Sequence, residues 1–228
     1  MQSGLKLLIV AALLFWIPYV EVVGLIVGAI AVIMIILAAD AFGSRHELFV
    51  WTSVFLFVAA QIAEFALAGS FAASVRSLPL SAPGPAAAIR VQAAFDDLLR
   101  GSIAVVSVAA ISFALITFEV NDLVGRVLAI GAVVIQILIS VILYFVVFGP
   151  LIHQAIADAF ASGTYNPAPI ESADATVSGL ASFHLLNSIP AIVFAFAYFR
   201  AYIRVGKFFK PRRTIPLPGP RVASPPPQ

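Results

Sequence analysis

A few polar side chains stand inside long apolar stretches of the chain, and their types and spacing could support chemistry. Glu64 follows Gln61 by three residues in the apolar stretch 48–68, so both side chains would lie on one face of a helix. A carboxylate in that setting could bind a proton or a cation. It could equally be an interfacial residue whose charged group reaches water, and we favour this second interpretation.

A second group lies near the other end of the sequence. His184, Asn187 and Ser188 are spaced i, i+3 and i+4 in an apolar stretch and would also share a helix face. With a rise of about 1.5 Å per residue, His184 and Glu64 fall at similar depth, so we expect them to contact each other if their helices touch. Such a pair could relay protons, or it could simply hold two helices together, which is the interpretation that we favour. Gln136, near the middle of the stretch 127–148, is expected to hold helices together in the same way.

The sequence carries no recognisable catalytic or metal-binding motif. It contains no H-E-x-x-H, no G-x-S-x-G, no P-loop and no G-x-G-x-x-G. The three histidines, His46, His153 and His184, are far apart in sequence, and the lack of cysteine excludes thiolate catalysis and thiolate metal sites. We therefore expect no enzymatic activity, no cofactor and no metal.

Composition restricts the fold class more than the 228-residue length does. The chain is 62% hydrophobic and 11% charged, against roughly 45–50% and about 25% in soluble domains, and its mean hydropathy is +1.07. A soluble core of this size could not hide so much apolar surface. This excludes a soluble enzyme, a disordered chain and a nucleic-acid binder, and it predicts an all-α polytopic transmembrane helix bundle.

Hydropathy divides the chain into a membrane-embedded bundle over 1–210 and a Pro-rich tail over 211–228. A transmembrane helix needs about 20 apolar residues, and about six spans are expected. The stretch 7–39 is too long for one span, and Pro18 and Glu21 mark a tight helical hairpin within it. We expect loops over 69–92 and 163–176, a kink at Pro190 and a disordered tail. The six spans are expected at 5–17, 22–39, 48–68, 102–118, 127–148 and 177–199.

Two amphipathic segments, 91–99 and 152–160, are expected as short helices on the outer side of the membrane. Their apolar residues recur at helical spacing, with charged and polar residues between them. They could lie flat in the interface, or they could extend the fourth and fifth spans and pack on each other. We favour extension.

Charge distribution predicts the orientation in the cell membrane. With six spans, ten of the thirteen Lys and Arg residues fall on one side, namely Lys6, Arg45, Arg126 and the seven from Arg200 onward, and the other three on the opposite side. The positive-inside rule then places both termini in the cytoplasm. The cations beyond the last span either contact anionic lipid or only anchor the topology; they are Arg204, Lys207, Lys210, Arg212 and Arg213.

The second apolar segment contains Gly24 and Gly28, four residues apart. Small residues at this spacing are typical of close helix packing. We expect this face to pack against another helix of the same chain. The run Phe-Trp-Ile-Pro-Tyr-Val at 15–20 joins two Gly-containing apolar segments. This opening hairpin resembles the start of uncharacterised multi-span membrane protein families that are widespread in archaea. The resemblance implies a membrane location and nothing about chemistry.

Three classes of function compete on the sequence alone. A non-catalytic subunit or scaffold of a membrane assembly is favoured, because the polar residues within the spans are sufficient for helix packing. The alternative is a small transporter or channel that uses the polar residues near the outer leaflet. A membrane-embedded enzyme has little support. The expected partners are the lipid bilayer and other membrane subunits or further copies of the chain, and no nucleic acid.

Overall fold

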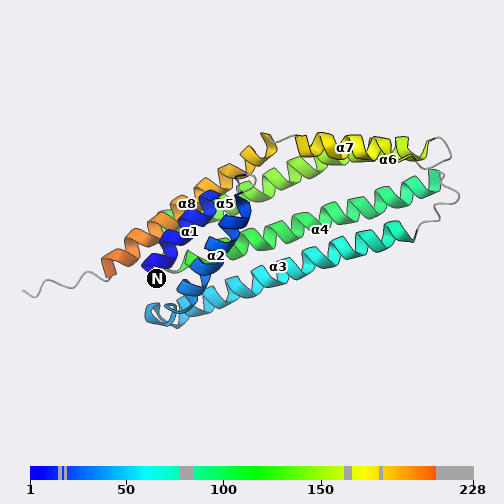
Figure 1. Cartoon of the computed structure of the whole chain (residues 1–228). Coiled ribbons are helices and arrows are strands. Elements are labelled where there is room, and N and C mark those ends of the chain that lie inside the picture. The colour runs from blue at the N-terminus through cyan, green and yellow to red at the C-terminus, as the bar shows by residue number, and fades with distance from the viewer. Residues whose placement is uncertain (15–16, 18–19, 78–84, 162–165, 180–181, 209–228) are drawn as a thin grey trace, which may run out of the picture.

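The computed structural model describes residues 1–14, 17, 20–77, 85–161, 166–179 and 182–208, without the side chains of 21, 174, 177–179, 182–185 and 208. In this part of the chain every regular element is a helix, which confirms the all-α prediction (Figure 1). Most are α-helices, whereas η1 is a 3₁₀ turn and η2 is a π-helix. The elements are α1 Gln2–Leu14, α2 Glu21–Ile36, η1 Asp40–Phe42, α3 Ser44–Arg76, α4 Pro85–Phe118, α5 Leu123–Val141, η2 Ile142–Phe148, α6 Gly149–Phe160, α7 Ala168–Gly179 and α8 Ser182–Phe208.

Within the described ranges, four helical segments are long and apolar enough to cross a membrane. They are Ser44–Arg76, Pro85–Phe118, Leu123–Phe160 and Leu186–Lys207. The first two have 33 and 34 residues, so each is about 50 Å long, against about 30 Å for the hydrocarbon core of a bilayer. The long helices therefore extend well beyond the thickness that a membrane would cover.

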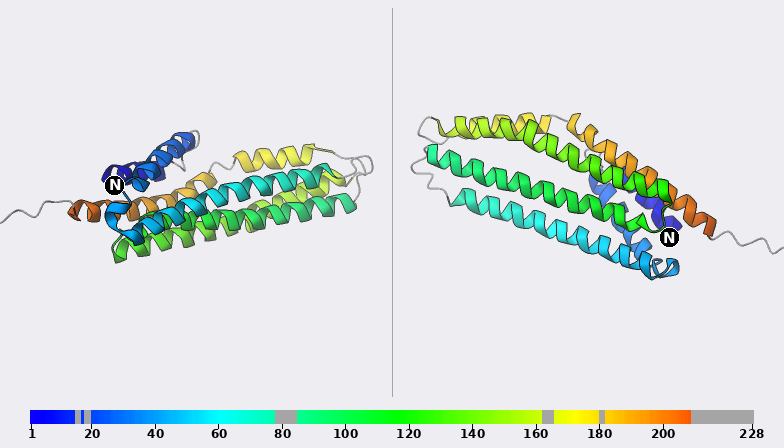
Figure 2. Two further views of the ribbon diagram at one scale, coloured as in Figure 1. Left: turned by 90° about the horizontal axis from the view of Figure 1, so that it is seen from below. Right: turned by 180° about the vertical axis from the view of Figure 1, so that it is seen from behind.

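The long helices lie side by side in a row. Helix α3 packs along α4, α4 packs along α5, and α5 packs along α8 (Figure 1). Helix α6 continues α5 through η2 and carries α7 on its side. The two short helices α1 and α2 stand out from the row at one end, where α1 packs on α8 (Figure 2).

Helices α1 and α2 form the predicted hairpin, but neither is as long as a full span. They have 13 and 16 residues, or about 20 and 24 Å. Their close approach depends on Gly4, where a Cβ would lie 3.1 Å from the backbone oxygen of Ala31. Leu5 and Ile35 are buried in the same core as Val205 of α8. The expected six spans thus become four long helices and one short hairpin.

The two expected loops are largely helical, so both predictions were wrong. Helix α3 continues to Arg76, and α4 begins at Pro85. Proline is well suited to the first position of a helix, where its missing N–H has no helical partner to lose. Similarly, α7 occupies 168–179 with Pro169 in its first turn. The Pro-rich tail and residues 78–84 lie outside the described part.

The amphipathic segments are parts of long helices, as the favoured interpretation holds. Segment 91–99 lies within α4, and 152–160 lies within α6, which follows η2 without a break. Their apolar faces pack together, because Val91 shares a buried cluster with Ile156 and Phe160. The structure therefore does not have two separate short helices lying in the interface.

Candidate functional site

Most of the described cations lie at one end of the row of helices. We call this the positive end; its cations are Lys6, Arg45, Arg126, Arg200, Arg204 and Lys207. It brings together the starts of α1, α3 and α5 with the last turns of α4 and α8. Arg76, at the end of α3, and Arg90, near the start of α4, lie at the opposite end. The structure thus keeps the charge asymmetry that the sequence predicts.

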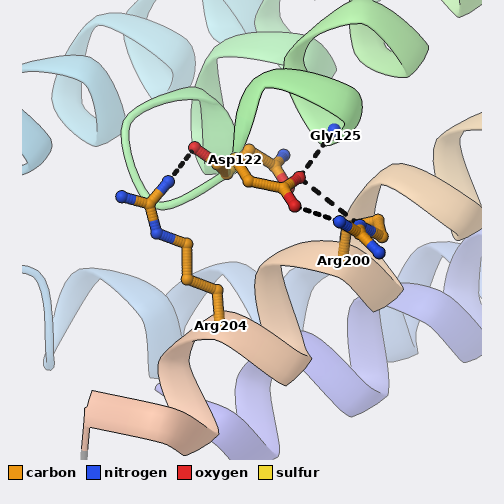
Figure 3. A network of polar contacts seen from close by, with 5 residues as sticks. Asp122, Gly125, Arg200 and Arg204 are labelled. Atoms are coloured by element: carbon orange, nitrogen blue, oxygen red, sulfur yellow. Dashed lines mark hydrogen bonds and ion pairs between the residues drawn. The ribbon is translucent and has the colours of Figure 1, made fainter.

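Asp122 is the central residue of the positive end. It caps the N-terminus of α5, where its Oδ1 accepts a hydrogen bond from the backbone N–H of Gly125 at 2.9 Å. The same carboxylate forms two hydrogen bonds with the guanidinium of Arg200 on α8, one of them from Nε at 3.4 Å (Figure 3). This paired geometry ties the start of α5 to α8.

The surroundings of Asp122 favour its ionised form. The hydrogen bond from Arg200 lowers the pKa of the Asp122 carboxyl below its usual value, and the N–H of Gly125 lowers it further. Burial opposes these effects, and the positive charges of Arg200 and Arg204 add smaller contributions that lower the pKa of Asp122 again. The carboxylate is therefore negative throughout the physiological pH range.

Arg204 and Arg126 fasten the turn between α4 and α5. The guanidinium of Arg204 donates a hydrogen bond to the backbone carbonyl of Asn121 (Figure 3). Arg126 donates from Nε to the carbonyl of Phe118 at 3.0 Å, and its Nη2 lies 3.5 Å from a carboxylate oxygen of Glu119. Arg126 thus satisfies a carbonyl that the end of α4 leaves without a helical partner, and Arg204 satisfies a carbonyl in the turn that follows.

Asn121 is fully buried inside this turn. Its Nδ2 donates to the hydroxyl of Thr117 at 3.1 Å, whereas its Oδ1 has no hydrogen-bond partner among the described residues. The side chain also fills the space beside Gly125, where any Cβ would collide with it. The turn is therefore tightly packed as well as hydrogen-bonded.

Three cations of the positive end line a hollow at the surface. Arg200, Arg204 and Lys207 of α8, together with Ile203 and Asp122, enclose about 240 Å³. One carboxylate faces three positive charges, so the hollow carries a positive excess. Its chemistry suits an anion rather than a cation or a reacting nucleophile.

His46, one of the three histidines, lies near the positive end. It lies in the first turn of α3 and is fully buried, with its ring edge-on to Phe42 at 5.7 Å between centroids. Neither ring nitrogen has a hydrogen-bond partner among the described residues. Such an unsatisfied buried group is unusual and costs stability.

The predicted contact between Glu64 and His184 requires α3 and α8 to touch, and these two helices do not pack along each other in the described part of the chain. Glu64 is exposed on α3, which packs along α4, whereas α8 packs along α5 and α1. The side chain of His184 lies outside the described part.

The other predicted residues are distributed over several helices. Gln61 is half-buried on α3 beside Glu64, Gln136 is half-buried on α5, and Asn187 and Ser188 are half-buried on the neighbouring α8. Gly24 is buried, and Gly28 faces the hairpin partner, because a Cβ at Gly28 would lie 3.5 Å from Cβ of Ala11 on α1. Lys210, Arg212 and Arg213 lie outside the described part.

Sequence reasoning missed a second polar contact, at the opposite end of the bundle. His153 of α6 and Asp96 of α4 lie 2.8 Å apart, Nε2 to Oδ1, and Gln92 donates to the backbone carbonyl of His153 at 3.0 Å. The signal was present, because these residues form the polar faces of the two amphipathic segments. It also missed the pair of Asp122 and Arg200, although Asp122 opens an apolar stretch as a helix-capping residue does.

Comparison of the chain with protein-family models, with characterised proteins and with solved structures finds no match. The functional argument therefore rests on the geometry of the bundle. That geometry has two polar ends, one strongly positive, separated by long apolar helices.

Proposed function

We propose that this protein is a multi-pass protein of the cell membrane that acts as a non-catalytic subunit or scaffold of a membrane assembly. The supporting observation is that two interior hydroxyl groups each connect one helix to another. The hydroxyl of Ser53 on α3 donates to the carbonyl of Ser112 on α4 at 2.7 Å. The hydroxyl of Tyr198 on α8 donates to the carbonyl of Phe113 on α4 at 3.0 Å. These contacts hold the helices in a fixed order, as a supporting subunit requires.

The outer faces of the bundle fit the same proposal. Large apolar side chains are exposed on α3 at alternating spacings of three and four residues. This spacing forms one continuous stripe along a helix, which would face lipid or the helix of another subunit. We call it the α3 stripe; it consists of Leu48, Trp51, Phe55, Val58, Ile62 and Phe65.

For the orientation, we propose that the positive end faces the cytoplasm. The chain has no native cysteine, so single cysteines can be introduced at the exposed residues Ser44 and Ser77, at the two ends of α3. In intact cells, a membrane-impermeant thiol reagent should label Ser77→Cys, and it should label Ser44→Cys only after permeabilisation. The reverse pattern would overturn the orientation and leave the fold unaffected.

The subunit proposal is tested by purifying the full chain from its own membranes in mild detergent. We expect another membrane protein to copurify at a fixed molar ratio. Substituting Phe55 and Ile62 of the α3 stripe together by alanine should release that partner without altering helix content. Alanine at Val127 and Val134, exposed on α5, provides the matched control. A chain that purifies alone from native membranes would contradict the proposal.

The alternative function as a small transporter or channel has one specific observation in its favour. The helix η2, between α5 and α6, is a seven-residue π-helix, and π-helical turns are frequent at functional sites. If the chain transports protons or cations, reconstituted vesicles should show a flux that Glu64→Gln abolishes and Glu171→Gln, exposed on α7, does not. That result would replace the subunit proposal.

A further inference from the structure

We propose that the hollow between the start of α5 and the last turns of α8 binds the phosphate headgroup of an anionic phospholipid. This inference does not depend on the subunit proposal, because it concerns only the residues around the hollow. It assigns a ligand class to the positive end, and it names Lys207, Arg204 and Arg200 as the residues that would attract the phosphate.

The first support is the charge and size of the hollow. Three cations of α8 line it with a single carboxylate, Asp122, which already pairs with Arg200. The residues that line the hollow therefore carry more positive than negative charge. The volume of about 240 Å³ is several times the roughly 30 Å³ that one water molecule occupies in the liquid. A phosphate group with its ester oxygens can be accommodated there.

The second support is an apolar stripe on α8 that leads to the hollow. Its residues recur at alternating spacings of three and four positions and are between 37% and 58% exposed; they are Ile189, Ile192, Phe196, Phe199 and Ile203. Ile203 belongs both to this stripe and to the lining of the hollow. A phospholipid with its headgroup in the hollow could lay an acyl chain along the stripe. Free phosphate has no chain to place there, so the stripe favours a lipid.

The third support is the depth of the hollow relative to the apolar helices. The segment of α8 that is apolar enough to cross a membrane ends at Lys207, which is one of the residues lining the hollow. On another side of α8, the ammonium of Lys6 lies 5.5 Å from the ring centroid of Tyr202. Tyrosine and basic residues are enriched where hydrocarbon meets headgroups. In a bilayer crossed by this segment, the hollow would lie at the level of the lipid phosphates.

The test measures lipid binding by the full chain in neutral detergent, with native mass spectrometry as the readout. Dioctanoyl phosphatidylglycerol, dioctanoyl phosphatidylcholine and inorganic phosphate are titrated separately. We expect selective binding of phosphatidylglycerol that weakens as salt is raised. Lys207→Gln should weaken it about fivefold, and Lys207→Glu about 25-fold, because each unit of charge near a headgroup contributes about that factor.

The matched control is Arg76→Gln. Arg76 is also an exposed cation in the last turn of a long helix, α3, but it lies at the opposite end of the bundle. It should leave phosphatidylglycerol binding unchanged, and unfolding temperatures should show that each variant is folded. Equal binding of phosphatidylcholine, or an equal loss with Arg76→Gln, would overturn the site. Competition by inorganic phosphate as effective as that by phosphatidylglycerol would overturn its assignment to a lipid.

Discussion

Replacing Gly125 by alanine should destabilise the turn that joins α4 to α5. A Cβ at this position would lie 2.6 Å from Cγ of Asn121, well inside van der Waals contact. Asn121 cannot easily move away, because it is fully buried and its Nδ2 is bonded to Thr117. Its backbone carbonyl is also held by Arg204. The added methyl group must therefore displace packed atoms or break hydrogen bonds.

The substitution Gly131→Ala on the same helix is the control from which the steric cost of Gly125→Ala can be measured. A Cβ at Gly131 would meet nothing within 4 Å, so Gly131→Ala should gain up to about 1 kcal/mol from the better helix propensity of alanine. Gly125→Ala has the same kind of gain but also the cost of overpacking, about 1–3 kcal/mol. Gly125→Ala should therefore have a lower free energy of unfolding than Gly131→Ala, and the difference should equal the cost of overpacking.

The measurement is equilibrium unfolding of the full chain in mixed micelles, followed by circular dichroism. Combining Gly125→Ala with Asn121→Ala should remove most of the added cost, since the colliding atoms are then absent, and a double-mutant cycle measures that coupling. If Gly125→Ala proves as stable as Gly131→Ala, Asn121 can move aside freely. The description of a tightly packed turn would then be wrong.

Three further predictions concern the same half of the bundle. His46→Leu should leave the unfolding temperature unchanged or raise it, because the buried ring nitrogens have no partner among the described residues; a marked loss would reveal a bound water or another partner. Tyr198→Phe keeps the ring stacked on Phe194 but loses the hydrogen bond to Phe113, and it should cost about 0.6–1.5 kcal/mol of unfolding free energy. The pKa of Asp122 is lower in the folded protein than its ordinary value of 3.8, so its contribution to stability is complete above that value and is lost as the pH falls through the folded pKa. An acid titration of the unfolding midpoint should therefore show a decline below about pH 4 that is reduced in Asp122→Asn, and identical profiles would contradict the pairing.

The features that the sequence predicts correctly are those that depend on local pattern. Hydropathy is sufficient for the all-α class, and the spacing of Val91 and Ile156 within their segments is sufficient for the packed extensions of α4 and α6. Loop predictions based on polarity failed, since Pro85 starts a helix instead of preventing one.

Contacts between distant segments could not be predicted in this way. Asp122 and Arg200 are 78 residues apart, and they meet only because α8 packs along α5. The predicted pair of Glu64 and His184 had matching depths, but depth does not determine which helices are neighbours. The order of helices in the row is set by the packing of whole faces, and no single residue encodes it.

The short hairpin of α1 and α2 gives the molecule unequal widths at its two ends. It packs against the half of α8 nearest the positive end, where Leu5 meets the core around Val205, and it adds two helices, each about 10 Å across, at that depth only. A membrane protein that is broader in one half of the bilayer acts as a wedge. The surrounding bilayer should bend so that its surface is convex on the side of the positive end. The protein should accordingly be enriched in narrow tubules over flat sheets of the same lipids, provided that the positive end faces outward from the tubule.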